Sequence, residues 1–353
     1  MKNKRTNYVA VIAVGACVVA LLWLSMRNKG PAEIDSGYRL VMGTFARIVA
    51  VAPDAPTARR SIESAFAVQD QIEQLMSFHR VDSELSKVNR EAFDHPVRVT
   101  AMTFEVLLKA VEISRLSEGV FDVTVGPLVE LWRHAGEANA PPSETELAQA
   151  RSKVGYEKLI LDANQMTVRF TVEGMKLDLG GIAKGYAVDK SVEAMRACGA
   201  TAGMVDLGGN IRCFGTPRGR DHWLIGVQDP FNVSDDMGPA KVLLILKLNP
   251  SQDAGTAVAT SGHYRRFVTV KGSKQSHIID TRTGHGSDKL ASVTVIAHDA
   301  ITADGLSTAV SVLGAEKGLR LIESLPQTEA ILILPEPRRE ILKSSGADRY
   351  IRQ

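Results

Sequence analysis

The stretch LDLGGIAKGYAVD, residues 177–189, groups polar residues and glycines in a way that suggests ligand binding. Asp178 lies in a short apolar stretch, and two glycines separate it from a helix predicted over residues 182–198. A glycine pair lets the backbone approach a ligand closely, and the first turn of a helix offers N–H groups to an anion. Lys184 lies in that turn, where a cation opposes the helix dipole. An anion-binding lysine and a solvated surface lysine both fit this pattern.

A second polar pair lies near the start of another helix, predicted over residues 300–313. Asp304 and Thr308 are four residues apart, so their side-chain oxygens can face the same point. A carboxylate, a hydroxyl and backbone carbonyl groups form the oxygen-only ligand set that Mg²⁺ prefers. The alternative is that Asp304 only stabilises the N-terminus of its helix, and the pair alone does not separate the two interpretations.

The composition excludes one broad class of function. The chain has 353 residues, enough for one large or two moderate domains. Its net charge is +2, but residues 1–30 hold five lysines and arginines and no acidic residue, so the remainder carries about −3. A mildly acidic body with few aromatic residues gives no support for nucleic-acid binding. The three cysteines, Cys17, Cys198 and Cys213, form neither a CxxC metal motif nor a disulfide framework.

The N-terminus predicts a membrane anchor. Residues 8–26 contain no charge and follow the basic start MKNKR, which favours an uncleaved transmembrane helix with the body outside the cytoplasm. A cleaved signal peptide is the first alternative, although no small-residue cleavage site follows the apolar run. A lipoprotein is the second, because Val14–Cys17 resembles a processing box. We therefore expect an anchor over residues 1–30 and a functional body over 31–353, with two subdomains at about 38–200 and 201–340 as a further option.

The pattern of the body predicts an α+β fold with mainly antiparallel sheet and packed helices. A capping box formed by Ser143 and Glu146 marks the start of one helix, which Gly155 closes. Residues 119–132 contain too much glycine and proline for a regular element. The other predicted helices span about 54–76, 101–117, 182–198, 300–313 and 317–324. The predicted strands lie at about 38–51 (a strand or hairpin arm), 158–161, 167–170, 204–205, 211–214, 223–227, 241–248, 267–270, 277–280, 292–297 and 330–334.

Taken together, the glycine-marked segments resemble the ApbE-type FAD:protein FMN transferases. LDLGGIAKGYAVD, DLGGN (206–210), ATSGHYR (259–265), HIIDTRTG (277–284) and TADGLSTAVSVLG (302–314) occur in the order found in that family. MGT (42–44), SELSKVN (83–89) and GVFDVTVGPLVELW (119–132) also match. The likeness covers about residues 38–335, and several long motifs in order make it specific.

The resemblance implies a concrete activity. Such enzymes have an ApbE-like, T-fold-type α+β structure, bind FAD and Mg²⁺, and transfer FMN to a Thr or Ser hydroxyl of an acceptor protein. The product is a phosphoester, and AMP is released. They act outside the cytoplasm of bacteria, at the inner membrane facing the periplasm, on flavoprotein subunits of membrane electron-transfer complexes. FAD, an acceptor protein and the membrane are therefore the expected partners, and nucleic acid is not.

The resemblance also implies which residues form the site. His277 matches a histidine that acts in the transfer step, although a lone histidine in a predicted strand is otherwise more often structural. The implied FAD contacts are Met42, His79, Val120, Phe121, Asp122, Asp178, Lys184 and the backbone at Ile278. The implied metal ligands are the Gly181 carbonyl, Asp304 and Thr308, with Ser307 nearby.

Two positions depart from the family pattern. His79 stands where a tyrosine that stacks on the flavin is common, which predicts weaker FAD binding. Thr281 replaces a proline of the HIIDPRTG motif and affects only local rigidity. Two other functions stay open at this point: a Mg²⁺-dependent FAD pyrophosphatase that releases FMN and AMP, and a protein that stores FAD without reacting.

Overall fold

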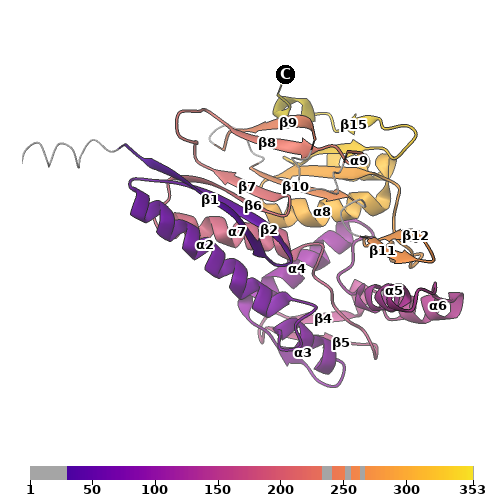
Figure 1. Cartoon of the computed structure of the whole chain (residues 1–353). Coiled ribbons are helices and arrows are strands. Elements are labelled where there is room, and N and C mark those ends of the chain that lie inside the picture. The colour runs from indigo at the N-terminus through magenta and orange to yellow at the C-terminus, as the bar shows by residue number, and fades with distance from the viewer. Residues whose placement is uncertain (1–29, 233–240, 251–255, 263–266, 353) are drawn as a thin grey trace, which may run out of the picture.

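The computed structural model describes residues 30–232, 241–250, 256–262 and 267–352. Its centre is an eight-stranded sheet, here sheet A, in which every neighbouring pair of strands is antiparallel (Figure 1). In spatial order its strands are β1 (Ala32–Val41), β2 (Thr44–Ala52), β6 (Ala202–Leu207), β7 (Asn210–Phe214), β10 (Ala257–Gly262), β13 (Ser292–Ala297), β14 (Glu329–Ile333) and β15 (Ile341–Lys343).

The predicted strand or hairpin arm at 38–51 is a hairpin of two long strands. Val41 pairs with Thr44, which leaves Met42 and Gly43 as a two-residue turn. Both turn residues have positive φ, 50° and 67°, and two-residue hairpin loops favour this conformation because it matches the twist of the strands. The turn therefore fixes the register of the hairpin and the direction in which Met42 leaves it.

Three helices cover one face of sheet A: α2 (Ala55–Met76), α7 (Ala183–Ala197) and α8 (Ala300–Leu313). They bury the apolar side chains that alternate along the strands, such as Ile48 on β2 and Val205 on β6. A hairpin of β8 (Trp223–Gln228) and β9 (Val242–Leu248) packs on part of the opposite face through Ile225, Val227 and Leu246. Both faces of the central strands are thus buried, and this layered arrangement confirms the predicted α+β class.

Smaller elements lie beside sheet A. The helices among them are α3 (Glu84–Glu91), α4 (Ala101–Leu116), α5 (Gly126–Ala138), α6 (Glu144–Ser152) and α9 (Ala315–Glu323), with short 3₁₀ turns at Tyr156–Lys158 and Ala347–Tyr350. A three-stranded sheet contains β3 (Val97–Arg98), β5 (Thr167–Phe170) and β4 (Leu159–Asp162), and β11 (Phe267–Val270) pairs with β12 (Ser273–Ser276). The predicted capping box of α6 is confirmed, since both of its hydrogen bonds form.

Several predictions of local structure were wrong. The punctuated segment 119–132 contains the start of α5, because Pro127 lies in the first turn of the helix, where its missing N–H is not needed. Residues 277–280, expected as a strand, form only a single bridge between Ile279 and Gly286. The apolar stretch before the glycine pair likewise forms only one bridge, from Lys176 to Val125. The helix α3 was not predicted, and Ser83 caps it by accepting a hydrogen bond from Ser86 N.

The predicted membrane anchor at residues 8–26 lies outside the described residues. Among the helices that the structure describes, none combines the length and apolar character needed to cross a bilayer. The suggested division near residue 200 stays a prediction, and strands from both sides of that point share sheet A.

Candidate active site

The candidate site is built where α7 crosses α8, and Gly185 makes the crossing close. A Cβ atom on Gly185 would lie 2.2 Å from the Ala300 carbonyl oxygen and 2.7 Å from Asp304 Cβ. Any side chain at this position would therefore push the helices apart. The absent side chain brings the first turn of α7 directly against the middle of α8, so the two polar groupings recognised in the sequence meet.

Asp304 is the acidic centre of this crossing. Its side chain is 3% exposed, and its Oδ2 accepts a hydrogen bond from the Gly185 N–H at 2.8 Å. Its Oδ1 lies 3.9 Å from Lys184 Nζ, an ion-pair distance that is too long for a hydrogen bond. Burial raises the pKa of Asp304, while Lys184 and the Gly185 N–H favour the ionised form. One carboxylate oxygen thus keeps its capacity to accept another electropositive partner.

Gly181 and Thr308 lie side by side beneath Phe121. A Cβ atom on Gly181 would be 3.3 Å from both Thr308 Oγ1 and Phe121 Cε2, so only glycine brings the backbone this near to the hydroxyl. Gly185 is the third residue of α7, so its N–H is one of the donors at a helix start that have no acceptor within the helix. It donates to Asp304 and thereby links the two helices. The structure brings together three of the four predicted metal-site residues: Gly181, Asp304 and Thr308.

Ser307, the fourth, points in a different direction. Its buried hydroxyl lies 2.8 Å from Ser261 Oγ at the end of β10 and donates to the Asp304 carbonyl at 2.8 Å. These bonds fasten α8 to sheet A. The sequence prediction placed Ser307 near the metal, and the structure gives its hydroxyl a role in joining the helix to the sheet.

Asp178 connects the glycine pair with the end of α2. It is partly buried, and its Oδ1 accepts the Gly180 N–H at 2.7 Å. Burial raises the pKa of Asp178, whereas His79 and Lys184 lie close enough to oppose that rise electrostatically. His79 is exposed and meets the Phe78 ring edge-on, with 5.9 Å between ring centroids. The structure therefore brings His79, Asp178 and Lys184 to one region.

Met42 reaches this region from the β1–β2 turn. Its N–H donates to Glu73 Oε2 at 3.1 Å, and Glu73 lies in the last turn of α2, shortly before His79. The turn also packs against the turn between β6 and β7, where Gly208 leaves room for the Thr44 side chain. Met42 is thus held at the edge of the site by its backbone.

All three residues of the segment 120–122 are buried. Phe121 packs beside Gly181, as described above. The Asp122 carboxylate is fully engaged: it accepts from Thr124 N and Oγ1 at 2.8 and 2.7 Å and from Tyr156 N at 2.6 Å. Burial raises the pKa of Asp122 against these bonds. Its side chain holds the loop in shape, so any contact of Asp122 with a ligand would come from its backbone.

His277 and Ile278 lie further along α8. The His277 side chain is exposed, and Ile278 packs with Val120 and Val312. The Ile278 N–H donates to Ser276 Oγ at 3.1 Å, and its carbonyl accepts from Ser287 N at 2.7 Å. Val312 is eight residues beyond Asp304, about 12 Å along the helix axis. Ile278 thus lies beside the last turn of α8, and its contact with Val120 brings it next to Phe121, which packs beside Gly181.

Sequence reasoning missed Asp189, the last residue of the LDLGGIAKGYAVD segment. Its Oδ1 accepts from Arg212 at 2.7 Å and from Ala300 N at 2.9 Å, and its Oδ2 accepts from Ile301 N at 2.9 Å. Burial raises its pKa to about 6, while Arg212 and the two N–H groups act in the opposite direction. Asp189 thereby ties α7 to the first residues of α8. The pairing spans more than a hundred residues of sequence, so spacing could not reveal it.

The arrangement suits an anionic ligand with a divalent cation. No cluster of three or more His, Cys, Asp or Glu side chains that could hold a metal occurs in the parts of the chain that the structure describes. A cation here would instead use one carboxylate, one hydroxyl and a backbone carbonyl, which is a hard oxygen set of the kind that suits Mg²⁺. Lys184 adds a positive charge beside it.

Comparisons with known proteins found similar proteins along most of the chain. The model of the ApbE family matches residues 42–332. The FAD:protein FMN transferase of Vibrio cholerae is 35% identical over 258 residues, which cover 72% of this chain and 74% of that protein. The enzyme of the same name from Haemophilus influenzae is 33% identical, over 82% of this chain and 83% of its own.

Solved structures show the same fold. The ApbE protein from Thermotoga maritima superposes with a TM-score of 0.79 at 32% identity, over 92% of this chain and all of the other. The flavin transferase ApbE from Vibrio cholerae superposes with a TM-score of 0.74 at 30% identity, over 91% of this chain and 99% of the other.

Proposed function

The chain belongs to the ApbE family, and on that premise we propose that it is a Mg²⁺-dependent enzyme that transfers FMN from FAD to a Ser or Thr hydroxyl of a protein. The new bond is a phosphoester, and AMP leaves. The observation that carries the proposal is the cluster of Asp304, Thr308 and Gly181 beside Lys184 at the α7–α8 crossing.

The residues of this cluster fit a magnesium ion. Asp304 Oδ1 makes no hydrogen bond to Lys184 at 3.9 Å, and the Gly181 backbone lies close to the Thr308 hydroxyl. Thr308 Oγ1 makes no hydrogen bond within the described part of the chain, so its lone pairs are available as well. When bound, Mg²⁺ would offset the negative charge that develops on the pyrophosphate oxygens during transfer.

The protein side chains perform the remaining tasks. Lys184 places its ammonium group where it can bind the phosphates of FAD, because Asp304 and the Gly180 carbonyl hold it at the start of α7. Phe121, His79 and Met42 surround the cluster and supply contacts for the flavin portion. His277 acts as the base that takes the proton from the acceptor hydroxyl, since a Ser or Thr hydroxyl is a weak nucleophile near neutral pH.

We place the acceptor and the enzyme at the same membrane surface. The uncharged stretch at residues 8–26 would anchor the chain in the bacterial inner membrane, with a lipoprotein anchor at Cys17 as the alternative. The body would then face the periplasm and meet flavoprotein subunits of membrane electron-transfer complexes. A single anchor leaves the site free to approach such a substrate.

The test uses the full chain with FAD, Mg²⁺ and candidate flavoprotein subunits. We expect covalent flavin fluorescence on the acceptor in a denaturing gel and an equivalent amount of AMP. Asp304→Asn keeps the shape of the side chain but removes its charge, so transfer should fall by about a hundredfold or more. Release of free FMN without labelling would instead identify a pyrophosphatase, and unchanged FAD would identify a storage protein.

The matched control is Asp299→Asn, which alters a carboxylate at the N-cap of the same helix. Asp299 accepts from Thr302 N at 3.0 Å and has no part in the proposed metal site. We expect this variant to keep its stability, because Asn caps a helix about as well as Asp, and to keep its transfer activity. Equal losses of activity in both variants would show that Asp304 acts only by supporting α8.

A further inference from the structure

One corner of sheet A lacks the cover that protects the rest of the sheet. Phe45 and Arg47 lie on the same face of β2 as Val49 and Val51, because side chains alternate along a strand. Val49 and Val51 are buried in the cluster that includes the β8–β9 hairpin, at 6% and 4% exposure, whereas Phe45 is 58% exposed. The β8–β9 hairpin thus covers the later part of β2 and leaves the residues next to the β1–β2 turn exposed.

Three large apolar side chains share this corner, which we call the open corner: Tyr38, Leu40 and Phe45. Leu40 pairs directly with Phe45 across the hairpin, and the Tyr38 ring meets the Phe45 ring edge-on at 6.3 Å between centroids. Tyr38 and Leu40 are 70% and 69% exposed. Contiguous exposed apolar side chains of this kind mark interaction sites more often than isolated ones do. Arg47, which also lies here, is already paired with Asp35 and covers the Tyr38 ring.

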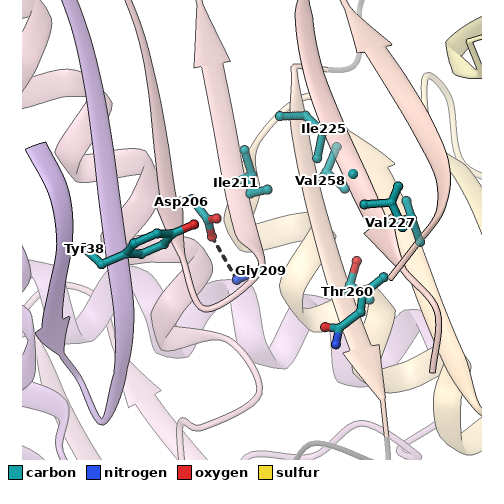
Figure 2. Close-up of a pocket in the computed structure, with 11 residues that line it drawn as sticks. Tyr38, Asp206, Gly209, Ile211, Ile225, Val227, Val258 and Thr260 are labelled. Carbon is teal, nitrogen blue, oxygen red and sulfur yellow. Dashed lines mark hydrogen bonds between the residues drawn. The ribbon is translucent and has the colours of Figure 1, made fainter. Parts of the chain in front are cut away.

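A cavity of about 270 Å³ adjoins the open corner. Figure 2 shows Tyr38 pointing toward Asp206 on one side, with Ile225 and Val227 of β8 on the other. Ile211 and Val258 form its floor on the central strands of the sheet. The lining mixes these apolar side chains with polar ones such as Asp206 and Thr260. A hollow beside an aromatic patch has the form of an interface that receives one anchoring side chain from a partner.

The open corner and the helices α7 and α8 lie on opposite faces of sheet A, and the corner approaches the candidate active site at the β1–β2 turn. Leu40 and Phe45 stand on either side of the turn that carries Met42, whose N–H is bonded to Glu73 near His79. The cavity also includes Gly209 and Thr260, and the next residue of β10 after Thr260, Ser261, contacts Ser307 on α8. An enzyme that modifies a protein must bind that protein at the surface next to its site.

We propose that the open corner and its cavity bind the acceptor protein, with a side chain of the acceptor that has an apolar body and a polar tip, such as Tyr, in the cavity and its Ser or Thr reaching past the β1–β2 turn. This inference rests on the proposed function. A partner with an apolar contact surface fits the open corner, because Arg47 is already paired with Asp35 and needs no acidic group from the partner. β1 is also an edge strand, whose outer side pairs with no described strand, so it leaves space for a partner to approach.

The test compares acceptor kinetics of the full chain and a charged variant, using the acceptor protein that the labelling experiment identifies. Leu40→Glu combined with Phe45→Glu should raise the KM for the acceptor by about tenfold or more, because charges would have to be buried in the interface. The affinity for FAD, measured by flavin fluorescence quenching, and the rate at saturating acceptor should stay unchanged. The control is Ile341→Glu on β15, an exposed position at the opposite edge of the same sheet.

Each other result would overturn the inference. An unchanged KM would mean that the acceptor binds elsewhere, and weaker FAD binding would mean that the corner belongs to the flavin site. If the wild type sediments as a dimer and the variant as a monomer, a second copy of this chain occupies the open corner. Loss of binding to phospholipid vesicles with an unchanged KM would identify the membrane. Absence of transfer by the wild type to every acceptor would refute the proposed function itself, and the inference with it.

Discussion

The buried carboxylate of Asp189 makes the stability of the fold depend on pH. Its pKa is about 6 in the folded protein against an ordinary value of 3.8, because burial outweighs the bonds from Arg212 and the start of α8. The folded state therefore holds the proton more tightly than the unfolded chain does. The contribution of Asp189 to the free energy of unfolding is largest below about pH 4 and is lost as the pH rises through about 6.

The size of the effect follows from the two pKa values. A difference of one in pKa corresponds to about 1.4 kcal/mol, so Asp189 should stabilise the fold by about 2 kcal/mol more at about pH 4.5 than at about pH 7. Asp189→Asn cannot ionise and should lose this dependence. Arg212→Met removes the strongest influence that lowers the Asp189 pKa, so the transition should move to higher pH.

Urea unfolding of the full chain at several pH values measures the difference. The quantity of interest is the free energy of unfolding of the wild type minus that of Asp189→Asn, which should rise as the pH falls from about 7 to about 4.5. Asp94→Asn, at an exposed position, controls for the loss of one negative charge. If the wild type and Asp189→Asn lose or gain stability in parallel over this range, Asp189 does not titrate there and the reasoning is refuted.

Three further outcomes are expected. His277→Ala should slow FMN transfer by about a hundredfold or more while FAD binding persists, and a collapse of FAD binding in titrations would assign His277 to the binding site or the fold. His79→Tyr should tighten FAD binding by about several-fold, because a phenol ring offers more apolar overlap with the flavin; equal affinities would show that His79 points away from it. Mass spectrometry of the native protein should find the N-terminal peptide intact, and a mature chain that starts near residue 30 or at a lipidated Cys17 would contradict the uncleaved anchor.

The local signals in the sequence predicted most of the elements because their causes are local. The capping box at Ser143, for example, depends on residues within a few positions of one another. The helix α5 escaped prediction because its glycine and proline were taken as breakers, whereas proline in a first turn is compatible with a helix. The segment 277–280 looked like a strand by composition, yet no neighbouring strand pairs with it beyond one bridge in the described part of the chain.

The site was predictable in its residue types and not in its contacts. Asp304 and Lys184 were recognised, but their meeting depends on two helices that the sequence separates by more than a hundred residues. Gly185 carried a signal that was overlooked: a glycine inside a helix costs about 1 kcal/mol relative to alanine and calls for a packing reason. Asp122 shows another limit of sequence prediction. It belongs to a motif of the family, yet its carboxylate accepts hydrogen bonds from Thr124 and Tyr156 and so stabilises the loop that carries its neighbours.

One backbone feature links the fold to the chemistry. Gly185 lacks a side chain, so α7 approaches α8 closely enough for the Gly185 N–H to reach Asp304. That bond fixes the orientation of the carboxylate beside Thr308 and the Gly181 backbone. FAD and its metal would thus be held by the helix layer on one face of sheet A. The open corner lies on the other face, on β1 and β2. Because separate elements form the two surfaces, a change at Phe45 can alter acceptor binding while the contacts around Asp304 stay in place.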